Sequence, residues 1–213
     1  TRPPATTPAS TFNSVGAALS MNGSAVALIG SQGLAIAAAD GSETTRMLTT
    51  TAHSQNDELG RAVVAISPNG ALVAAPLDSD AIGVWRSDGS LMQTLPFNNS
   101  VQALVFGPDG TTLIASSLAN STLHKVVQQW NLNDATPLQR IELPEVHLER
   151  PIFLDNQHIA AFSKNGDDKT MYATWNLAGT SPAASPMQDV TAPSLYDQAT
   201  MIAGTSPVLW QPL

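Results

Sequence analysis

The amino-acid sequence predicts an all-β protein made of repeated four-stranded antiparallel units. Short runs of small and β-branched residues alternate with polar turns, most of which place Asn or Asp next to Gly. These turns recur every 40 to 47 residues, and all four tryptophans end short β-like runs at one place in the repeat. No stretch shows sustained helical periodicity. A repeat of this length, read as strands, indicates sheets that stack on one another.

Each copy of the repeat begins with two β-rich runs joined by a polar turn. The turn positions are Asn22, Asn69, Asp109, Asn156 and Asp197. The copies cover residues 17–30, 62–76 and 101–117, with weaker copies at 152–163 and 194–204. Asn-Gly and Asp-Gly suit tight hairpins because both residues tolerate a positive φ.

A third run in each copy ends at a tryptophan, and a fourth follows it. The tryptophans are Trp85, Trp130, Trp175 and Trp210, and Ala37 takes the matching place in the first copy. Residues 90–95 and 137–143 are the clearest fourth strands. A large aromatic side chain at one repeated position is expected to pack between neighbouring units, where it buries a large area.

A single four-stranded sheet cannot bury both of its faces, so such units are expected to pack around an axis. The predicted fold is a β-propeller of four-stranded antiparallel blades, with about five repeats visible. The fifth repeat ends three residues after Trp210 and lacks its outer strand. The ring is either closed through an N-terminal strand at residues 5–13 or part of a larger ring.

The repeat resembles that of WD40-type propellers. The resemblance rests on Phe106 to Gly110 (Phe-Gly-Pro-Asp-Gly), on Ile66 to Gly70 (Ile-Ser-Pro-Asn-Gly) and on the Trp that ends each third strand. The Trp-Asp dipeptide is absent, since Trp85 precedes Arg86 and Trp130 precedes Asn131. The buried His-Ser-Asp-Trp hydrogen-bond network of that family is therefore not expected. Lactonase and quinoprotein-like propellers share the same rhythm of turns and strands.

Two further stretches complete the predicted organisation. Residues 1–13 form a Pro/Thr-rich linker, which could also supply the closing outer strand, and residues 14–213 form the blades. Residues 179–193, rich in proline and small residues, are predicted as a long loop. The linker and the scarcity of charge slightly favour an extracytoplasmic location, but the compartment stays open.

The composition excludes several classes of protein. The net charge is −8, and only 12% of residues are charged. Nucleic-acid binders and polybasic membrane-surface proteins carry a basic surplus instead. No apolar run is long enough to cross a bilayer, so no membrane insertion is expected. The absence of cysteine excludes disulfides and thiolate chemistry.

No motif for catalysis, metal binding or cofactor binding is present, so no enzyme activity, metal or cofactor is predicted. No pair of histidines has the spacing of metal ligands, and His158 is expected at the surface beside a turn. Residues 78–80 and 165–168 faintly resemble calcium loops, but turn chemistry explains them more simply.

The loops on one rim of such a propeller hold just over half of the charged residues. Charged loops on a rigid scaffold are where binding usually resides. The candidate partner-binding residues on this rim are Asp78, Asp80, His124, Lys125, Glu149, Asp167, Asp168 and Lys169.

The leading functional hypothesis is a non-catalytic scaffold that binds a protein partner or a neighbouring domain through this rim. One alternative is a lactonase- or hydrolase-type propeller enzyme, with His124, Asp78 and Glu149 as the first suspects. The other alternative is an accessory subunit of a larger assembly, whose outer surface would be poor in charge.

Overall fold

The computed structural model describes residues 12–42, 45–52, 62–77, 81–118, 125–143, 149–155, 157–164, 170–176 and 188–189. Within these ranges the chain forms strands and turns and no helix. The strands build four separate four-stranded antiparallel sheets, and in each sheet the strands follow one another in chain order. The predicted all-β class and the four-stranded antiparallel unit are therefore confirmed.

The first two sheets come from the first two copies of the repeat. The first sheet contains β1 (Ser14–Leu19), β2 (Ala25–Gly30), β3 (Gly33–Ala38) and β4 (Arg46–Thr49). The second sheet contains β5 (Ala65–Ile66), β6 (Leu72–Pro76), β7 (Ala81–Arg86) and β8 (Leu91–Pro96).

The third and fourth sheets follow in the same way. The third sheet contains β9 (Ala103–Phe106), β10 (Thr112–Leu118), β11 (Lys125–Asn131) and β12 (Thr136–Leu143). The fourth contains β13 (Glu149–Phe153), β14 (His158–Lys164), β15 (Thr170–Asn176) and β16 (Gln188–Asp189). The fifth predicted repeat, at residues 194–204 and Trp210, lies outside the described residues.

The prediction of a continuous loop over residues 179–193 is wrong at Gln188 and Asp189. These two residues form β16, which pairs with Met171 and Tyr172 of β15. The prediction failed because the proline and small residues on both sides of this short strand are typical of a loop. Its place at the outer edge explains how so short a segment completes the sheet, since an edge strand needs only one partner.

The second and third strands of all four sheets share one register, so the repeat in sequence is also a repeat in space. Val26, Val73, Leu113 and Ile159 each pair with the position predicted for tryptophan, which is Ala37, Trp85, Trp130 or Trp175. The assignment of Ala37 to the tryptophan position is thereby confirmed. Trp210 lies outside the described residues.

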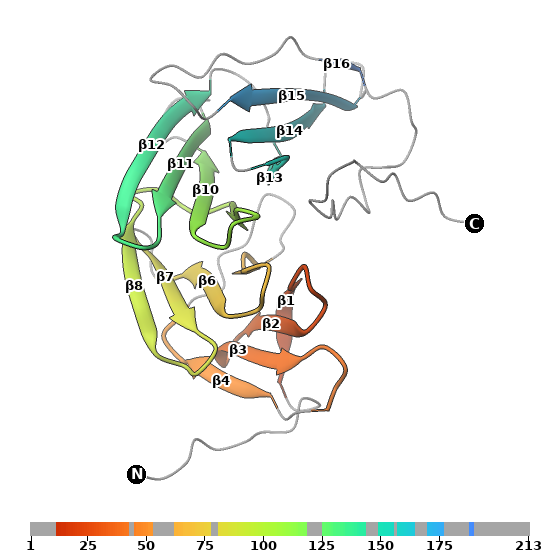
Figure 1. Ribbon diagram of the computed structural model, residues 1–213, viewed down its shortest axis with the longest axis vertical. Coiled ribbons are helices and arrows are strands. Elements are labelled where there is room, and N and C mark those ends of the chain that lie inside the picture. The colour runs from red at the N-terminus through yellow and green to blue at the C-terminus, as the bar shows by residue number, and fades with distance from the viewer. Residues whose placement is uncertain are drawn as a thin grey trace, which may run out of the picture.

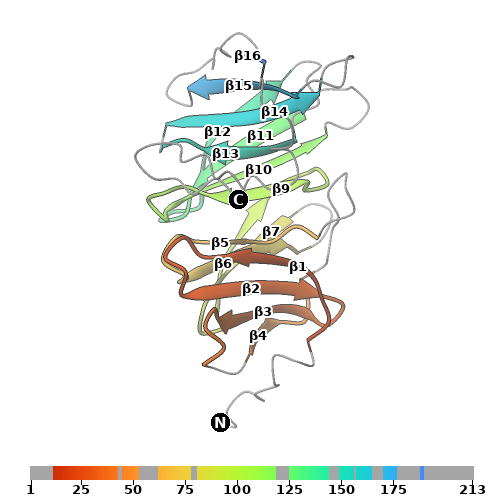
Figure 2. The same cartoon turned by 90° about the vertical axis from the view of Figure 1, so that its right-hand side faces the viewer.

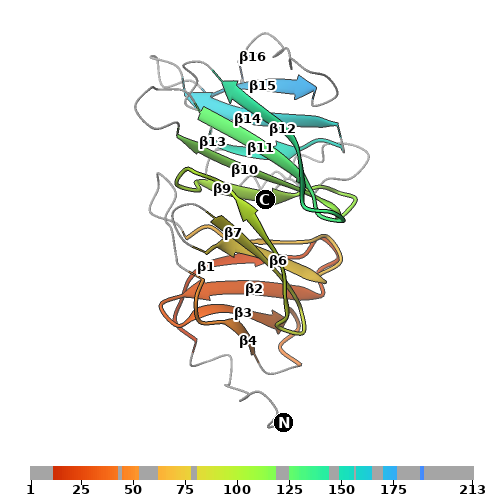
Figure 3. The same cartoon turned by 90° about the vertical axis from the view of Figure 1, so that its left-hand side faces the viewer.

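The sheets lie one after another along an open arc (Figure 1), and the side views show them as stacked layers (Figures 2 and 3). The outer strands β4, β8 and β12 lie on the convex side of the arc. The innermost strands meet from sheet to sheet, since β5 contacts β1 and β9, and β13 contacts β9. The first and fourth sheets lie at the two ends of the arc.

The core lies between the sheets, because the second sheet is buried on both faces. On one face, Val73, Ala75 and Trp85 join Ala27, Ile29 and Leu34 of the first sheet in one apolar cluster. On the other face, Ala74, Ile82 and Val84 join Leu104, Leu113 and Trp130 of the third sheet in another. Alternate residues of one strand thus belong to different cores, as the two-residue period of a strand requires.

Trp85 and Trp130 pack between sheets, as predicted. Trp85 and Trp130 both face the preceding sheet, and both are almost fully buried, as is Trp175. The Trp130 ring meets Phe97 edge to face, with the ring centroids 5.8 Å apart. A Cβ atom on Gly83 would lie 2.2 Å from the Trp85 indole, so only glycine fits beneath that ring.

The indole nitrogen of Trp130 is buried and has no hydrogen-bond partner in the described part of the chain. The tryptophan of this repeat therefore acts through its apolar surface.

Candidate partner-binding rim

The two ends of the strands define two rims of different construction. The turn rim holds the connections β1–β2, β3–β4 and their equivalents in the later sheets. The loop rim, at the opposite end, holds the connections β2–β3 and their equivalents, together with the connections from one sheet to the next. β2, β10 and β14 point the same way in Figure 2, so the rims run across the first, third and fourth sheets. The turn between β5 and β6 of the second sheet lies on the turn rim too, because Pro68 accepts a hydrogen bond from Asn22.

Hydrogen bonds join neighbouring sheets along the turn rim. The backbone N–H of Asn22 donates to the carbonyl of Pro68 at 3.0 Å. The guanidinium of Arg46 donates to the Ser87 carbonyl at 3.2 Å, and the amide of Gln93 donates to the Leu132 carbonyl at 2.6 Å. The first three sheets are thus fixed to one another at this end.

The turns of this rim are held by their own side chains. In the first hairpin, Asn22 Oδ1 accepts hydrogen bonds from the Ser20 hydroxyl and from the Ser24 backbone N–H. The second hairpin repeats this arrangement, with Ser67 donating to Asn69 Oδ1 at 2.8 Å. The glycines after these two asparagines have positive φ, as the Asn-Gly pattern predicts.

The carboxylates of the β3–β4-type turns are used in the same way. Asp40, Asp88 and Asp134 each accept a hydrogen bond from the backbone N–H and the hydroxyl of the Ser or Thr two residues later. Hydrogen bonding from that hydroxyl, and then from the backbone N–H, lowers the pKa of all three carboxyl groups. These acids stabilise their own turns.

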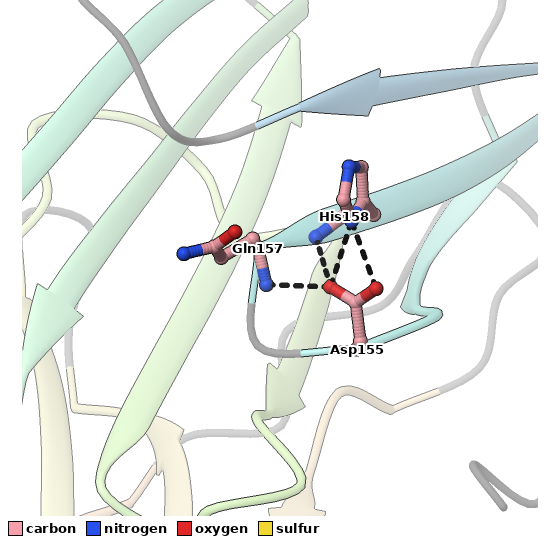
Figure 4. Close-up of polar contacts among 3 residues, drawn as sticks. All are labelled: Asp155, Gln157 and His158. Carbon is pink, nitrogen blue, oxygen red and sulfur yellow. Dashed lines mark hydrogen bonds and ion pairs between the residues drawn. The ribbon is translucent and has the colours of Figure 1, made fainter. Parts of the chain in front are cut away.

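His158 follows the turn between β13 and β14, in which an Asp carboxylate also accepts backbone N–H groups (Figure 4). The Asp155 carboxylate accepts the backbone N–H groups of Gln157 and His158 at 2.7 and 2.8 Å, and it contacts His158 Nδ1 at 2.8 Å. The N–H of Gln157 is the largest cause of the lowered pKa of Asp155, followed by the His158 side chain. The His158 side chain is 40% exposed, which confirms the expected surface position beside a turn.

Two of the candidate binding residues are placed by the structure. Lys125 is the first residue of β11 and Glu149 the first of β13, so they belong to strand ends and not to loops as predicted. Lys125 pairs with Leu118 and Leu143, and Glu149 pairs with Phe162. Pairing with the neighbouring strand extends each strand by one or two residues beyond the boundary that polarity suggests.

The other six candidates, Asp78, Asp80, His124, Asp167, Asp168 and Lys169, lie outside the described residues. They fall in the connections β6–β7, β10–β11 and β14–β15. The strand ends on either side of each connection belong to the loop rim, together with Lys125. The topology thus assigns the anchor points of these segments to one rim.

The described residues contain no group of three His, Cys, Asp or Glu side chains that could hold a metal ion. They also contain no helix with the length and apolar character needed to span a bilayer. The possible calcium-loop fragments at residues 78–80 and 165–168 are not among them.

The free face of the first sheet is a feature that the sequence interpretation missed. This face points away from the second sheet, and no other sheet of the described residues packs on it. It consists of Ala17, Leu19, Val26, Leu28, Ala35, Ala37 and Met47, of which Ala35 at the centre is fully buried. Leu19 is 61% exposed. A signal was present, because apolar residues occupy both alternating positions of residues 25–29, as they do in strands buried on both faces.

Comparison with known proteins gives no family. No protein-family model matches the chain, and no curated protein matches it. One solved structure that it resembles is Kuenenia stuttgartiensis hydrazine synthase, at 11% sequence identity and a TM-score of 0.44. That alignment covers 87% of this chain and 69% of the other.

Proposed function

We propose that the four sheets are blades of a divergent WD40-like propeller, and that the protein is a scaffold which binds a protein partner or a neighbouring domain through its loop rim. The contrast between the two rims supports this proposal most directly. The Asn and Asp side chains of the turn rim hold their own turns. The six charged candidates instead belong to connections whose flanking strand ends are on the loop rim; they are Asp78, Asp80, His124, Asp167, Asp168 and Lys169.

The construction of the core also favours a scaffold. The second sheet is packed on both faces, and the first three sheets are joined along the turn rim, which gives a rigid base. Binding residues are commonly carried on loops of such a base. Charged loop residues would act mainly on the rate and specificity of association. We propose that the ring either closes through residues 5–13 or continues as a larger ring. Binding at the loop rim requires neither.

The loop-rim proposal is tested by cross-linking the full chain to its partners in the source cells, followed by mass spectrometry. The variant Asp167→Ala/Asp168→Ala/Lys169→Ala should reduce cross-linking of a specific partner at least tenfold. The control Arg86→Ala/Arg140→Ala, which changes exposed charges away from the loop rim, should leave it unchanged. If the loop-rim variant cross-linked the partner as strongly as the control does, residues 167–169 would be excluded as a binding site.

An accessory subunit of a larger assembly is the second candidate function. The free face of the first sheet favours it, because an uncharged apolar sheet face is a typical feature of surfaces that become buried in assemblies.

A further inference from the structure

Two equivalent turns on the turn rim contain an Asn-Gly pair, which is chemically labile. Asn22-Gly23 joins β1 to β2 in the first sheet, and Asn69-Gly70 joins β5 to β6 in the second. Asparagine is among the less stable side chains of proteins. A glycine after it gives the side-chain amide an unhindered backbone neighbour, because glycine has no Cβ.

The reaction available to such a pair is deamidation. The backbone nitrogen of the glycine bonds to Cγ of the asparagine, and the side-chain nitrogen leaves as ammonia with the proton of the backbone N–H. The resulting five-membered succinimide is then opened by water at either of its two carbonyl groups. The products are aspartate and isoaspartate, and water is the only reagent consumed.

Hydrogen bonds within the two turns resist this reaction in nearly the same way. In each turn, the glycine N–H donates to the carbonyl of the residue three positions earlier at 2.9 Å. Oδ1 of each asparagine accepts the serine hydroxyl two residues earlier at 2.8 Å and the backbone N–H two residues later at 3.0 Å. Asn22 Oδ1 also accepts the Ser24 hydroxyl at 2.7 Å. The glycine nitrogen must leave its carbonyl partner before it can attack, so both turns must open locally.

The cover over the two glycines is different. Gly70 is buried, and a Cβ atom on it would lie 3.1 Å from Ala25 Cβ and 3.3 Å from Ser24 Oγ of the first sheet. Gly23 is exposed, and a Cβ atom there would meet no atom of the described chain within 4 Å. Opening of the second turn must therefore also break a contact between sheets, whereas opening of the first turn breaks none at its glycine.

One hydrogen bond does join the first turn to the second sheet. The backbone N–H of Asn22 donates to the Pro68 carbonyl at 3.0 Å. This nitrogen takes no part in closing the succinimide ring, because the attacking nitrogen is that of Gly23. The bond fixes the chain before the asparagine and leaves the peptide unit after it without a contact to the second sheet.

We propose that Asn22 is a site of spontaneous deamidation in the folded protein, and that the first sheet protects Asn69 from the same reaction. The aspartate product fits the turn, since Asp109 takes the equivalent position in the third sheet. There its carboxylate accepts the backbone N–H groups of Thr111 and Thr112 at 2.8 and 3.0 Å. The isoaspartate product adds a methylene group to the main chain and does not preserve these bonds. This inference does not depend on binding at the loop rim.

Peptide mapping by mass spectrometry, after incubation of the full chain in mildly alkaline buffer, tests the proposal. Trypsin separates the two sites, because Arg46 and Arg61 lie between them. In the folded chain, Asn22 should be converted about tenfold faster than Asn69, since the second turn opens less often. Similar rates at the two sites, whether fast or slow, would overturn the proposal.

The same measurement in urea is the matched control. Once the chain is unfolded, the sheets no longer cover either turn, so Asn22 and Asn69 should react at similar rates. A faster reaction at Asn22 that persisted in urea would assign the difference to the neighbouring sequence and would overturn protection by the first sheet. A third pair, Asn165-Gly166, lies outside the described residues and falls in a separate tryptic peptide after Lys164, so it does not disturb the comparison.

Discussion

At the scale of single residues, the turns between the third and fourth strands favour glycine at one repeated position, because the backbone there has a positive φ. Gly41 and Gly89, in the β3–β4 and β7–β8 turns, have φ values of 72° and 93°. Ala135 follows Asp134 in the equivalent turn of the third sheet and has a φ of 58°. It is the one non-glycine residue with positive φ in the described part of the chain. An L-residue in this conformation is less stable by about 1–2 kcal/mol.

This difference predicts opposite effects for two reciprocal substitutions. Gly89→Ala should lower the free energy of unfolding by about 1 kcal/mol, since the new methyl group meets no atom closer than 3.8 Å and only the backbone is strained. Ala135→Gly should raise it by about 0.5 kcal/mol, because loss of a partly buried methyl group offsets part of the gain. Urea denaturation measures both. A change in the same direction for both variants would contradict the explanation.

At the scale of the elements, the second and third sheets are each held by a tryptophan that the third strand places against the preceding sheet. Trp130 on β11 is fully buried in the core between the second and third sheets. Its indole nitrogen has no partner in the described chain, so its contribution comes from packing. The ring that it contacts, Phe97, lies in the connection that leads from the second sheet into the third.

Two substitutions at Trp130 separate packing from hydrogen bonding. Trp130→Ala should lower the free energy of unfolding by about 3–5 kcal/mol through the cavity that it leaves. Trp130→Phe should cost no more than about 1–2 kcal/mol, because it keeps an aromatic ring beside Phe97 and removes a buried, unpaired N–H. Thermal and urea denaturation measure the two values. An equal loss for both variants would show that the indole itself is essential.

The prediction of four-stranded units was correct because its determinants are local. A hairpin depends on a few turn residues, such as Asn69 and Gly70, and on the alternation of the runs beside them. The short strand β16 could not be predicted, because it is set by pairing with β15 and not by its own two residues. The loop positions predicted for Lys125 and Glu149 are wrong for the same reason.

At the scale of the whole molecule, the turn carboxylates should make the stability depend on pH. The pKa of Asp40, Asp88, Asp134 and Asp155 is lowered from the ordinary value of 3.8. A lowered pKa in the folded state contributes stability that is complete above the pKa of the unfolded state. This contribution is lost as the pH falls through the lower, folded-state value.

The free energy of unfolding should therefore be nearly constant between pH 5 and 7 and fall below about pH 4. The variant Asp40→Asn/Asp88→Asn/Asp134→Asn should show a weaker dependence on pH in this acid range, because the amides do not titrate. Denaturation curves at a series of pH values provide the measurement. An unchanged acid slope in the variant would assign the dependence to other groups.

The sequence by itself determined the length of the repeat, the chemistry of the turns and the position of the tryptophans. All three depend on residues close together in the chain, and the observed register confirms them. Only the tertiary structure decided which face of each sheet is covered. Ala17, Leu19 and Val26 follow the same alternation as their equivalents in the later sheets, but burial depends on whether another sheet stacks on that face. Stacking is a contact between distant parts of the chain, which a local pattern does not encode.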